Sequence, residues 1–403
     1  VLVAPFRAFL GFRSDTHRSA IGWRRVPFIW FGSLYQFGGL AFMPFALILL
    51  SGDQIHGPDW AGEALAGVAF VMTGLGLHMT QTAGLALAAD QAEPEKRHRV
   101  VALLYVMFLV GMAISALIFG ALLRDFSAIR LIQVVQGAAA LPLVLNLIAL
   151  WKQERMNPMT REERAAPRPR FSDAFFDLLG QGRMLRVMAA VALGTAAFSM
   201  QDVLLEPYGG EILGLSVAAT TTLTAVWALG ALIGFALASK RLGEGRDPFR
   251  VAAHGLLAGI GAFSAVIFSA PLDSAPLFFF GATLIGFGSG LFAVSMLTAV
   301  LDMPREGLVD SGLALGAWGA AQATAAGLAI AAGGFIRDIF GAWAMSGALG
   351  PGMATPFAGY SFVYHIEIGL LFLTIIAIGP LVRVGSLRRD GARAGFGLRE
   401  FPT

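Results

Sequence analysis

The chain has 403 residues, of which 56% are hydrophobic and only 14% are charged, and its formal net charge is +3. Soluble globular domains are about 45–50% apolar and about 25% charged, so this composition indicates a membrane protein. It excludes a cytosolic enzyme, a secreted disulfide scaffold and a nucleic-acid-binding domain. The chain has no cysteine, which also excludes thiol catalysis and cysteine-ligated metal centres.

Ten segments are apolar over the roughly 20 residues that a helix needs to cross a bilayer. In chain order they cover residues 26–51, 62–89, 100–123, 128–151, 184–207, 215–239, 249–271, 275–301, 309–336 and 358–382. Most of the 50 glycines lie inside these segments, where small residues let helices approach closely. The sequence therefore predicts an all-α polytopic membrane protein built as a packed helical bundle.

Basic residues predict the orientation of these spans. All 29 Lys and Arg except Arg124, Arg130 and Arg337 lie at one set of helix ends. By the positive-inside rule that side is cytoplasmic, and both ends of the chain lie on it.

A hydrophilic stretch over residues 152–183 divides the spans into four and six. We interpret it as a cytoplasmic linker between an N-terminal half, 1–151, and a C-terminal half, 184–385, which a basic tail over 386–403 follows. Within the linker four apolar residues recur at helical spacing and predict a short helix on the membrane surface: Phe171, Phe175, Phe176 and Leu179.

The two halves share a repeated pattern. Gly74-x-Gly76, Asp90 and Arg124-Asp125 recur, at a nearly constant offset, as Gly286-x-Gly288, Asp302 and Arg337-Asp338. This register pairs the second span of the first half with the fourth span of the second half. We therefore expect a 6 + 6 protein with parallel halves, in which ten helices are visible and the first two are missing from this chain.

Twelve spans, a central cytoplasmic loop and a basic loop before the first visible span resemble the major facilitator superfamily. The loop Gly11-Phe-Arg-Ser-Asp15, continuing to Gly22-Trp-Arg24-Arg25, resembles that superfamily's loop motif, with a wider spacing between Asp15 and Gly22. The resemblance implies a cytoplasmic charge latch between the halves, which Asp90 and Asp302 would join at helix ends. The alternative is a solvated topology signal. The residues of the expected latch are Asp15, Arg18, Arg24 and Arg25.

Longer strings resemble the PucC/LhaA family, the bacteriochlorophyll-delivery branch of the major facilitator fold in photosynthetic bacteria. They cover Pro5 to Gly52, the string RVVALLYVMFLVGMAISALIFG from Arg99, and MQDVLLEPYGGEILGLSV from Met200 to Val217. The string from Gly11 to His17 is closer to the light-harvesting-1 (LH1) type, LhaA, than to the peripheral-antenna (LH2) type.

This resemblance implies a non-enzymatic assembly factor for light-harvesting antenna in the bacterial inner (intracytoplasmic) membrane. It implies bacteriochlorophyll a as the ligand that the protein binds or delivers, with carotenoid or lipid as further candidates. The implied partners are the light-harvesting α and β polypeptides, bacteriochlorophyll synthase, the reaction-centre core and membrane lipids, but no nucleic acid. The alternative function is a proton-coupled secondary transporter of a small molecule. The span 62–89 lacks the arginine that many coupled transporters have there, which favours assembly over transport.

Ionisable groups at membrane depth are costly and are therefore candidate functional residues. Asp202 and Glu206 lie four residues apart, on one face of a predicted helix, with Gln201 beside Asp202. One interpretation is a proton site or polar-ligand site. The other is an interfacial anchor or a hydrogen bond between helices.

Two histidines are candidate axial ligands of a chlorin magnesium, because a neutral imidazole nitrogen suits such a metal. His78 lies in the middle of a span, with Gln81 and Thr82 one turn later on the same face. His365 lies in the last span, two residues from Glu367, and the two therefore point to different faces. For both histidines the alternative is a hydrogen bond within the helix packing.

Overall fold

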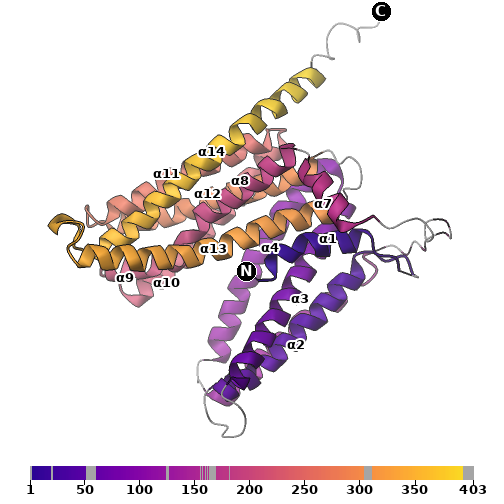
Figure 1. Ribbon diagram of the computed structural model, residues 1–403, viewed down its shortest axis with the longest axis horizontal. Helices are drawn as coiled ribbons and strands as arrows, with labels where there is room; N and C mark the ends of the chain where they lie inside the picture. The colour runs from indigo at the N-terminus through magenta and orange to yellow at the C-terminus, as the bar shows by residue number, and fades with distance from the viewer. Residues whose placement is uncertain are drawn as a thin grey trace, which may run out of the picture. The chain divides into compact units, whose positions relative to one another are not determined.

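The computed structural model describes residues 2–19, 21–50, 60–123, 127–154, 156, 158, 160, 162, 169–180, 182–303 and 311–393 (Figure 1). Within these ranges every regular element is a helix, and ten helices are long and apolar enough to cross a membrane. The prediction of an all-α polytopic membrane protein is thus confirmed. The repeated pair Arg124-Asp125 lies outside the described residues.

Contacts divide the chain into two compact units. Unit 1 comprises Val1–Ala92, Met107–Leu178 and Pro304–Ala320. Within it α2 packs along both α3 and α5, and α1 packs on α3. Its elements are η1 (Ala4–Phe6), α1 (Arg7–Asp15), α2 (Val26–Leu50), α3 (Ala61–Gln91), most of α4 (Arg97–Leu122), α5 (Ala128–Ala149), α7 (Phe171–Gly180) and the first turns of α13 (Ser311–Met345).

Unit 2 comprises Glu93–Val106, Leu179–Met303 and Ala321–Thr403. In this unit α12 packs along α10 and α11, and α14 packs on α8 and α11. Its elements are η2 (Pro94–Lys96), the start of α4, α8 (Gly182–Ser199), η3 (Met200–Val203), α9 (Leu205–Glu211), α10 (Val217–Gly243), α11 (Pro248–Ser269), α12 (Ala275–Asp302), the rest of α13, η4 (Pro351–Met353) and α14 (Phe357–Arg393). The sequence boundaries 1–151, 152–183 and 184–385 stay a prediction.

Small residues and side-chain caps explain why α11 and α12 lie where they do. Asp247 accepts a hydrogen bond from the backbone N of Phe249 at 2.8 Å, and Pro248 follows at the first helical position, which is a strong start signal for α11. A Cβ at Gly255 would lie 2.6 Å from the carbonyl oxygen of Gly288, and a Cβ at Gly288 would lie equally close to the oxygen of Gly255. The glycines therefore permit close packing of the two backbones.

Three elements differ from the expectations. The predicted span 184–207 is interrupted, because α8 ends at Ser199 and α9 restarts at Leu205, which places Pro207 in a first turn where its missing N–H costs little. The predicted span 309–336 continues as α13 to Met345. The segment expected to be a loop over residues 11–15 belongs to the helix α1, because no proline interrupts it.

The short helix expected in the linker is present as α7. Ala174 and Leu178 are buried on its inner face. Phe171 packs edge-on against Phe9 and Phe12 of α1, with ring centroids 5.4 and 5.5 Å apart. Aromatic contacts thus attach α7 to α1 within unit 1.

Candidate functional site

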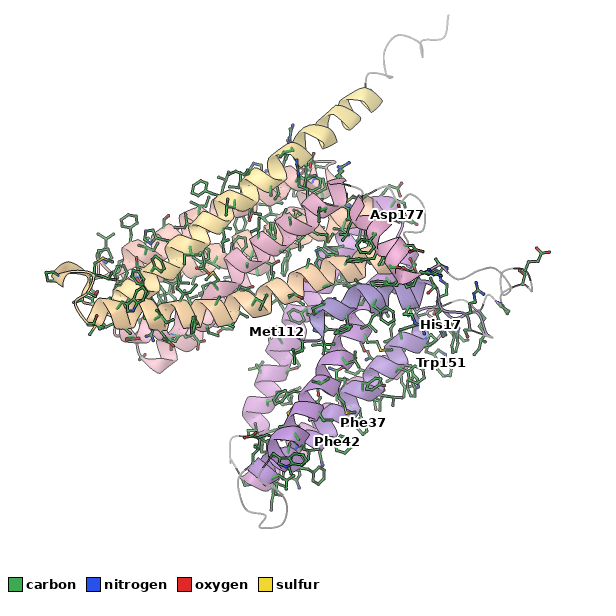
Figure 2. The ribbon with its side chains drawn as sticks, in the orientation of Figure 1. His17, Phe37, Phe42, Met112, Trp151 and Asp177 are labelled. Atoms are coloured by element: carbon green, nitrogen blue, oxygen red, sulfur yellow. The ribbon has the colours of Figure 1, made fainter. Side chains whose placement is uncertain are left out.

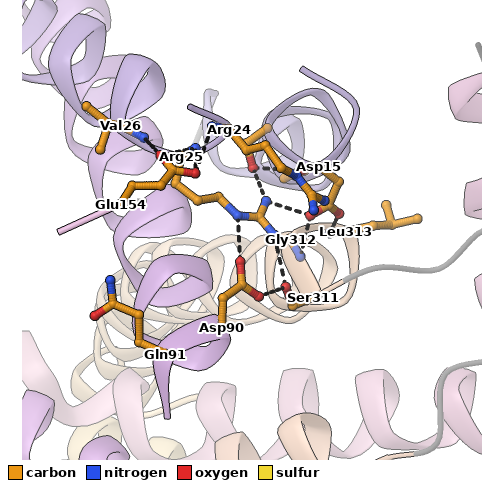
Figure 3. A network of polar contacts seen from close by, with 12 residues as sticks. Asp15, Arg24, Arg25, Val26, Asp90, Gln91, Glu154, Ser311, Gly312 and Leu313 are labelled. Carbon is orange, nitrogen blue, oxygen red and sulfur yellow. Dashed lines mark hydrogen bonds and ion pairs between the residues drawn. The ribbon is translucent and has the colours of Figure 1, made fainter. Parts of the chain in front are cut away.

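Arg25, the residue just before α2, lies at the centre of a buried charge network in unit 1 (Figure 3). Its Nη1 lies 2.5 Å from Oδ1 of Asp15, and its Nε lies 3.0 Å from Oδ2 of Asp90. The guanidinium also donates to the hydroxyls of Ser14 and Ser311, at 2.6 and 3.0 Å. The side chains of Arg25 and Asp15 are only 2% and 3% exposed, so water screens this ion pair weakly.

Asp15 also caps the first turn of α13. Its carboxylate accepts hydrogen bonds from the backbone N of Gly312 at 3.0 Å and of Leu313 at 2.7 Å. These N–H groups have no partner inside the helix, and a carboxylate at a helix N-terminus is favourable. The network therefore joins residues almost 300 positions apart in the chain within one unit.

Burial lowers the pKa of Arg25, but the carboxylates of Asp15 and Asp90 outweigh that effect, and the pKa is raised above its ordinary value. The guanidinium accordingly stays charged. A buried ion pair of this kind becomes very costly when one partner is removed. The arrangement can hold helices together but offers no group for catalysis.

The structure thus brings Asp15 and Arg25 of the expected latch together, with Asp90 as a third member (Figure 3). Arg18 and Arg24 lie on the same segment between α1 and α2. Asp302 lies in unit 2, where its carboxylate is 4.0 Å from Nη1 of Arg97.

Glu154 is a member of this region that the sequence analysis missed. Its carboxylate accepts hydrogen bonds from the backbone N of Arg24, Arg25 and Val26, at 2.7, 3.0 and 2.9 Å. It therefore caps the start of α2 from the segment that follows α5 (Figure 3). No local motif links residues so far apart in the chain, so only the fold brings them together.

Gln201 and Asp202 lie in the break between α8 and α9, in unit 2. Gln201 is buried, and its Nε2 donates to Oδ1 of Asp202 at 2.6 Å. Glu206 is exposed and accepts a hydrogen bond from Thr224 of α10 at 3.2 Å. Asp202 thus lies in the 3₁₀ turn η3 and Glu206 in α9, so the two do not belong to one regular α-helix, and each binds its own partner.

Glu367 is a second residue that the sequence analysis did not select. It lies on α14 and is fully buried, and neither carboxylate oxygen makes a hydrogen bond of good geometry among the described residues, although the backbone N–H of Gln201 lies near it. Asp202 and Tyr364 lie within electrostatic range of it. An ionised carboxylate in such a place is costly without a partner, so this group is a candidate for binding a proton or a cationic group. The sequence feature that could have identified this residue is a glutamate inside an apolar span.

His78 lies half-buried on α3, and its Nδ1 has no hydrogen-bond partner in the part of unit 1 that the structure describes. Gln81 is exposed, whereas Thr82 is buried and accepts a hydrogen bond from Nε of Arg7 at 3.1 Å. Arg7 also lies within electrostatic range of His78, so His78 and Thr82 share this neighbour. His78 keeps an unpaired ring nitrogen, but that atom has almost no accessible surface.

His365 has the geometry of a histidine prepared to ligate a metal. Its Nδ1 lies 2.6 Å from the backbone oxygen of Ser361, which orients the ring and leaves Nε2 free of that bond. The ring is exposed and lines a pocket of about 260 Å³ together with Phe340, Phe357 and Phe362. The rings of Phe340 and Phe362 stack at 4.0 Å with an interplanar angle of 2°.

Among the described residues no group of three or more His, Asp or Glu side chains could hold a metal ion. The pocket of His365 offers one imidazole among aromatic side chains, which is enough to supply a single axial ligand but not to hold a free ion.

Comparison with known proteins gives consistent matches over the whole chain. The sequence profile of the family described as PUCC protein matches residues 1–386. A Rhodobacter capsulatus protein described as "Uncharacterized protein in puhA-bchM intergenic region" is 61% identical over 406 residues, which cover 100% of this chain and 84% of that protein. Protein PucC of Rhodobacter capsulatus is 48% identical, with coverage of 96% and 83%, and Protein PucC of Cereibacter sphaeroides is 47% identical, with coverage of 95% and 82%.

Solved structures of transporters share the fold. A bacterial homologue of the iron transporter ferroportin superposes with a TM-score of 0.68 at 15% identity, over 94% of this chain and 88% of that chain. The major facilitator superfamily transporter FucP superposes with a TM-score of 0.62 at 14% identity, over 94% and 89%. The predicted major facilitator fold is thereby confirmed.

Proposed function

The chain belongs to the PUCC protein family, and we propose that it is a non-enzymatic assembly factor that binds bacteriochlorophyll and delivers it to antenna polypeptides. The close relatives support a role in photosynthetic antenna or pigment-related membrane function. We place the protein in the bacterial inner membrane with both visible chain ends in the cytoplasm, as the distribution of basic residues predicts.

The observation that carries the proposal is the arrangement at His365. A chlorin magnesium takes an axial ligand, and a neutral imidazole can supply it. The backbone oxygen of Ser361 holds Nδ1 of this ring at 2.6 Å, so Nε2 is the nitrogen available to the pigment. Phe340, Phe357 and Phe362 supply apolar, flat walls for a macrocycle. The ring is exposed, so the ligand can leave as well as enter.

The proposed antenna partners are single-span α and β polypeptides that meet the protein inside the membrane. Unit 1 exposes large apolar side chains along α2 and α4, among them Phe37, Phe42 and Met112 (Figure 2). Such surfaces suit packing against lipid or against apolar partner helices. We propose the LH1 type over the LH2 type because the string from Gly11 to His17 is closer to the LH1 type.

The test is the near-infrared absorption of the full chain, purified in mild detergent from pigment-producing cells. We expect bound bacteriochlorophyll in the wild type and its loss in His365→Phe. His78→Phe tests the second histidine, and we expect it to keep the pigment because His78 does not line the pocket of His365. A colourless wild type, or equal pigment in wild type and His365→Phe, would refute the assignment.

A proton-coupled transporter is the second candidate function, and the buried Glu367 favours it. Transport would need a carboxyl that exchanges protons at membrane depth, and Glu367 next to Asp202 has that placement. Counterflow of a small solute in proteoliposomes, lost in Glu367→Gln and unchanged in His365→Phe, would support transport over pigment delivery.

A further inference from the structure

A basic pocket of about 350 Å³ opens in unit 2 between the end of α10 and the start of α11, with α12 behind it. Its polar wall consists of three guanidinium groups and one imidazole, and its apolar wall includes Leu237 and Phe287. The polar residues are Arg241, Arg246, Arg250 and His254. The pocket is therefore amphipathic, with positive charge on one side and hydrocarbon on the other.

The charge of this pocket is only partly compensated. Nη1 of Arg241 lies 3.5 Å from Glu244, whereas Arg246 and Arg250 make no ion pair with any carboxylate that the structure describes. The buried carboxylate of the nearby Asp247 makes no ion pair with either of them and accepts the backbone N–H of Phe249. An anion in this pocket would thus meet unpaired guanidinium groups, which favour phosphate.

His254 adds a directed polar group. Its Nδ1 lies 2.7 Å from the backbone oxygen of Arg250, which orients the ring, and the ring lines the pocket. One turn of α11 therefore supplies both Arg250 and His254 to the same wall.

The pocket lies at the ends of two membrane-spanning helices, and this position favours an amphiphilic ligand. Leu237 lies two turns before Gly243, where α10 ends, and Phe287 faces the pocket from inside α12. A small inorganic anion would use only the guanidinium groups, whereas a lipid uses both walls. Basic pockets between membrane helices on the cytoplasmic side are typical sites for anionic lipid headgroups.

We propose that this pocket binds the phosphate headgroup of an anionic phospholipid through Arg246 and Arg250, with one acyl chain along Leu237 and Phe287. The site is separate from the pocket of His365, so it stands or falls independently of pigment delivery. The bound lipid fixes the loop between α10 and α11 at the membrane surface.

The experiment measures binding of single lipids to the full chain by native mass spectrometry, with phosphatidylglycerol and phosphatidylcholine as probes. We expect tight one-to-one binding of phosphatidylglycerol and about 30-fold weaker binding in Arg246→Gln/Arg250→Gln. Each cation near anionic lipid contributes about 1 kcal/mol, and about 1.36 kcal/mol corresponds to a factor of ten. Lys240→Gln/Arg186→Gln is the matched control, because it removes two exposed basic residues of the same unit that do not line the pocket.

Leu237→Asn adds a test of the apolar wall. It should weaken phosphatidylglycerol binding but leave any binding of inorganic phosphate unchanged. Three results would each overturn the proposal. The first is an equal loss of binding in the Arg and control variants, and the second is equal affinity for both lipids. The third is saturable binding of inorganic phosphate that neither Leu237→Asn nor added lipid affects. Thermal melting of the variants, unchanged from wild type, separates loss of the site from unfolding.

Discussion

Replacing Arg25 by Gln should loosen the N-terminal turn of α13 strongly. The variant removes the ion pairs with Asp15 and Asp90 and the hydrogen bonds to Ser14 and Ser311. It removes the charge of Arg25 from beside the buried carboxylate of Asp15. Breaking a buried pair by removing one partner costs about 3–5 kcal/mol.

The assay is amide hydrogen exchange of the full chain in lipid nanodiscs, with attention to Gly312 and Leu313. Both amides donate to Asp15, so they report directly on the network. At 1.36 kcal/mol per factor of ten, a loss of about 3 kcal/mol accelerates exchange through local opening by about 100-fold. We expect this acceleration in Arg25→Gln at neutral pH.

The double variant Asp15→Asn/Arg25→Gln provides the matched comparison. It removes both charges of the pair, so it should be less destabilised than the sum of the two single variants. Two results would show that the network is a solvated topology signal and not a latch. One is an amide exchange rate in Arg25→Gln within about threefold of wild type. The other is strict additivity of the free-energy changes in the double variant.

Three further predictions follow from other contacts. Gly286→Val should destabilise the protein by about 1–3 kcal/mol in thermal melting, because a Cβ there would overlap the carbonyl oxygen of Trp227, whereas Gly84→Val should be neutral because nothing lies within 4 Å of its Cβ. Glu367→Met should keep or raise the melting temperature, because it replaces a buried carboxyl that makes no hydrogen bond of good geometry among the described residues; a clear fall would show that the backbone N–H of Gln201 binds it. Glu154→Gln should weaken the start of α2 by about 1 kcal/mol, seen as faster amide exchange at its first residues, and unchanged exchange there would contradict the capping role.

Membrane spans could be predicted because apolar length alone decides them. The exception is instructive: Pro207 was interpreted as the end of a span, but it lies in the first turn of α9, where a missing N–H is harmless. A proline after an apolar run thus signals either an end or a restart. Hydrophobicity does not distinguish a helix end from a restart. The outcome depends on which hydrogen-bond partners the free backbone N–H and C=O groups find.

The charge network could be predicted only in part. Asp15 and Arg25 belong to a recognisable sequence pattern, so they were selected, but their partner Ser311 lies 286 residues from Arg25 in the chain. Glu367 escaped selection for a similar reason. Whether a glutamate of α14 faces lipid or the interior depends on how that helix packs on α8 and α11, and a single sequence does not contain that information. The carbonyl contact of His365, by contrast, is local, because Ser361 lies four residues before it.

The cap that Glu154 supplies to α2 has a consequence for biosynthesis. Val26 and Glu154 lie 128 residues apart, so the ribosome completes α2, α3, α4 and α5 before the carboxylate exists. Until then the first amides of α2 depend on water or on lipid headgroups for hydrogen bonds. The insertion machinery must therefore hold an unfinished helix end near the aqueous boundary, and closure of this end marks completion of the first four visible spans.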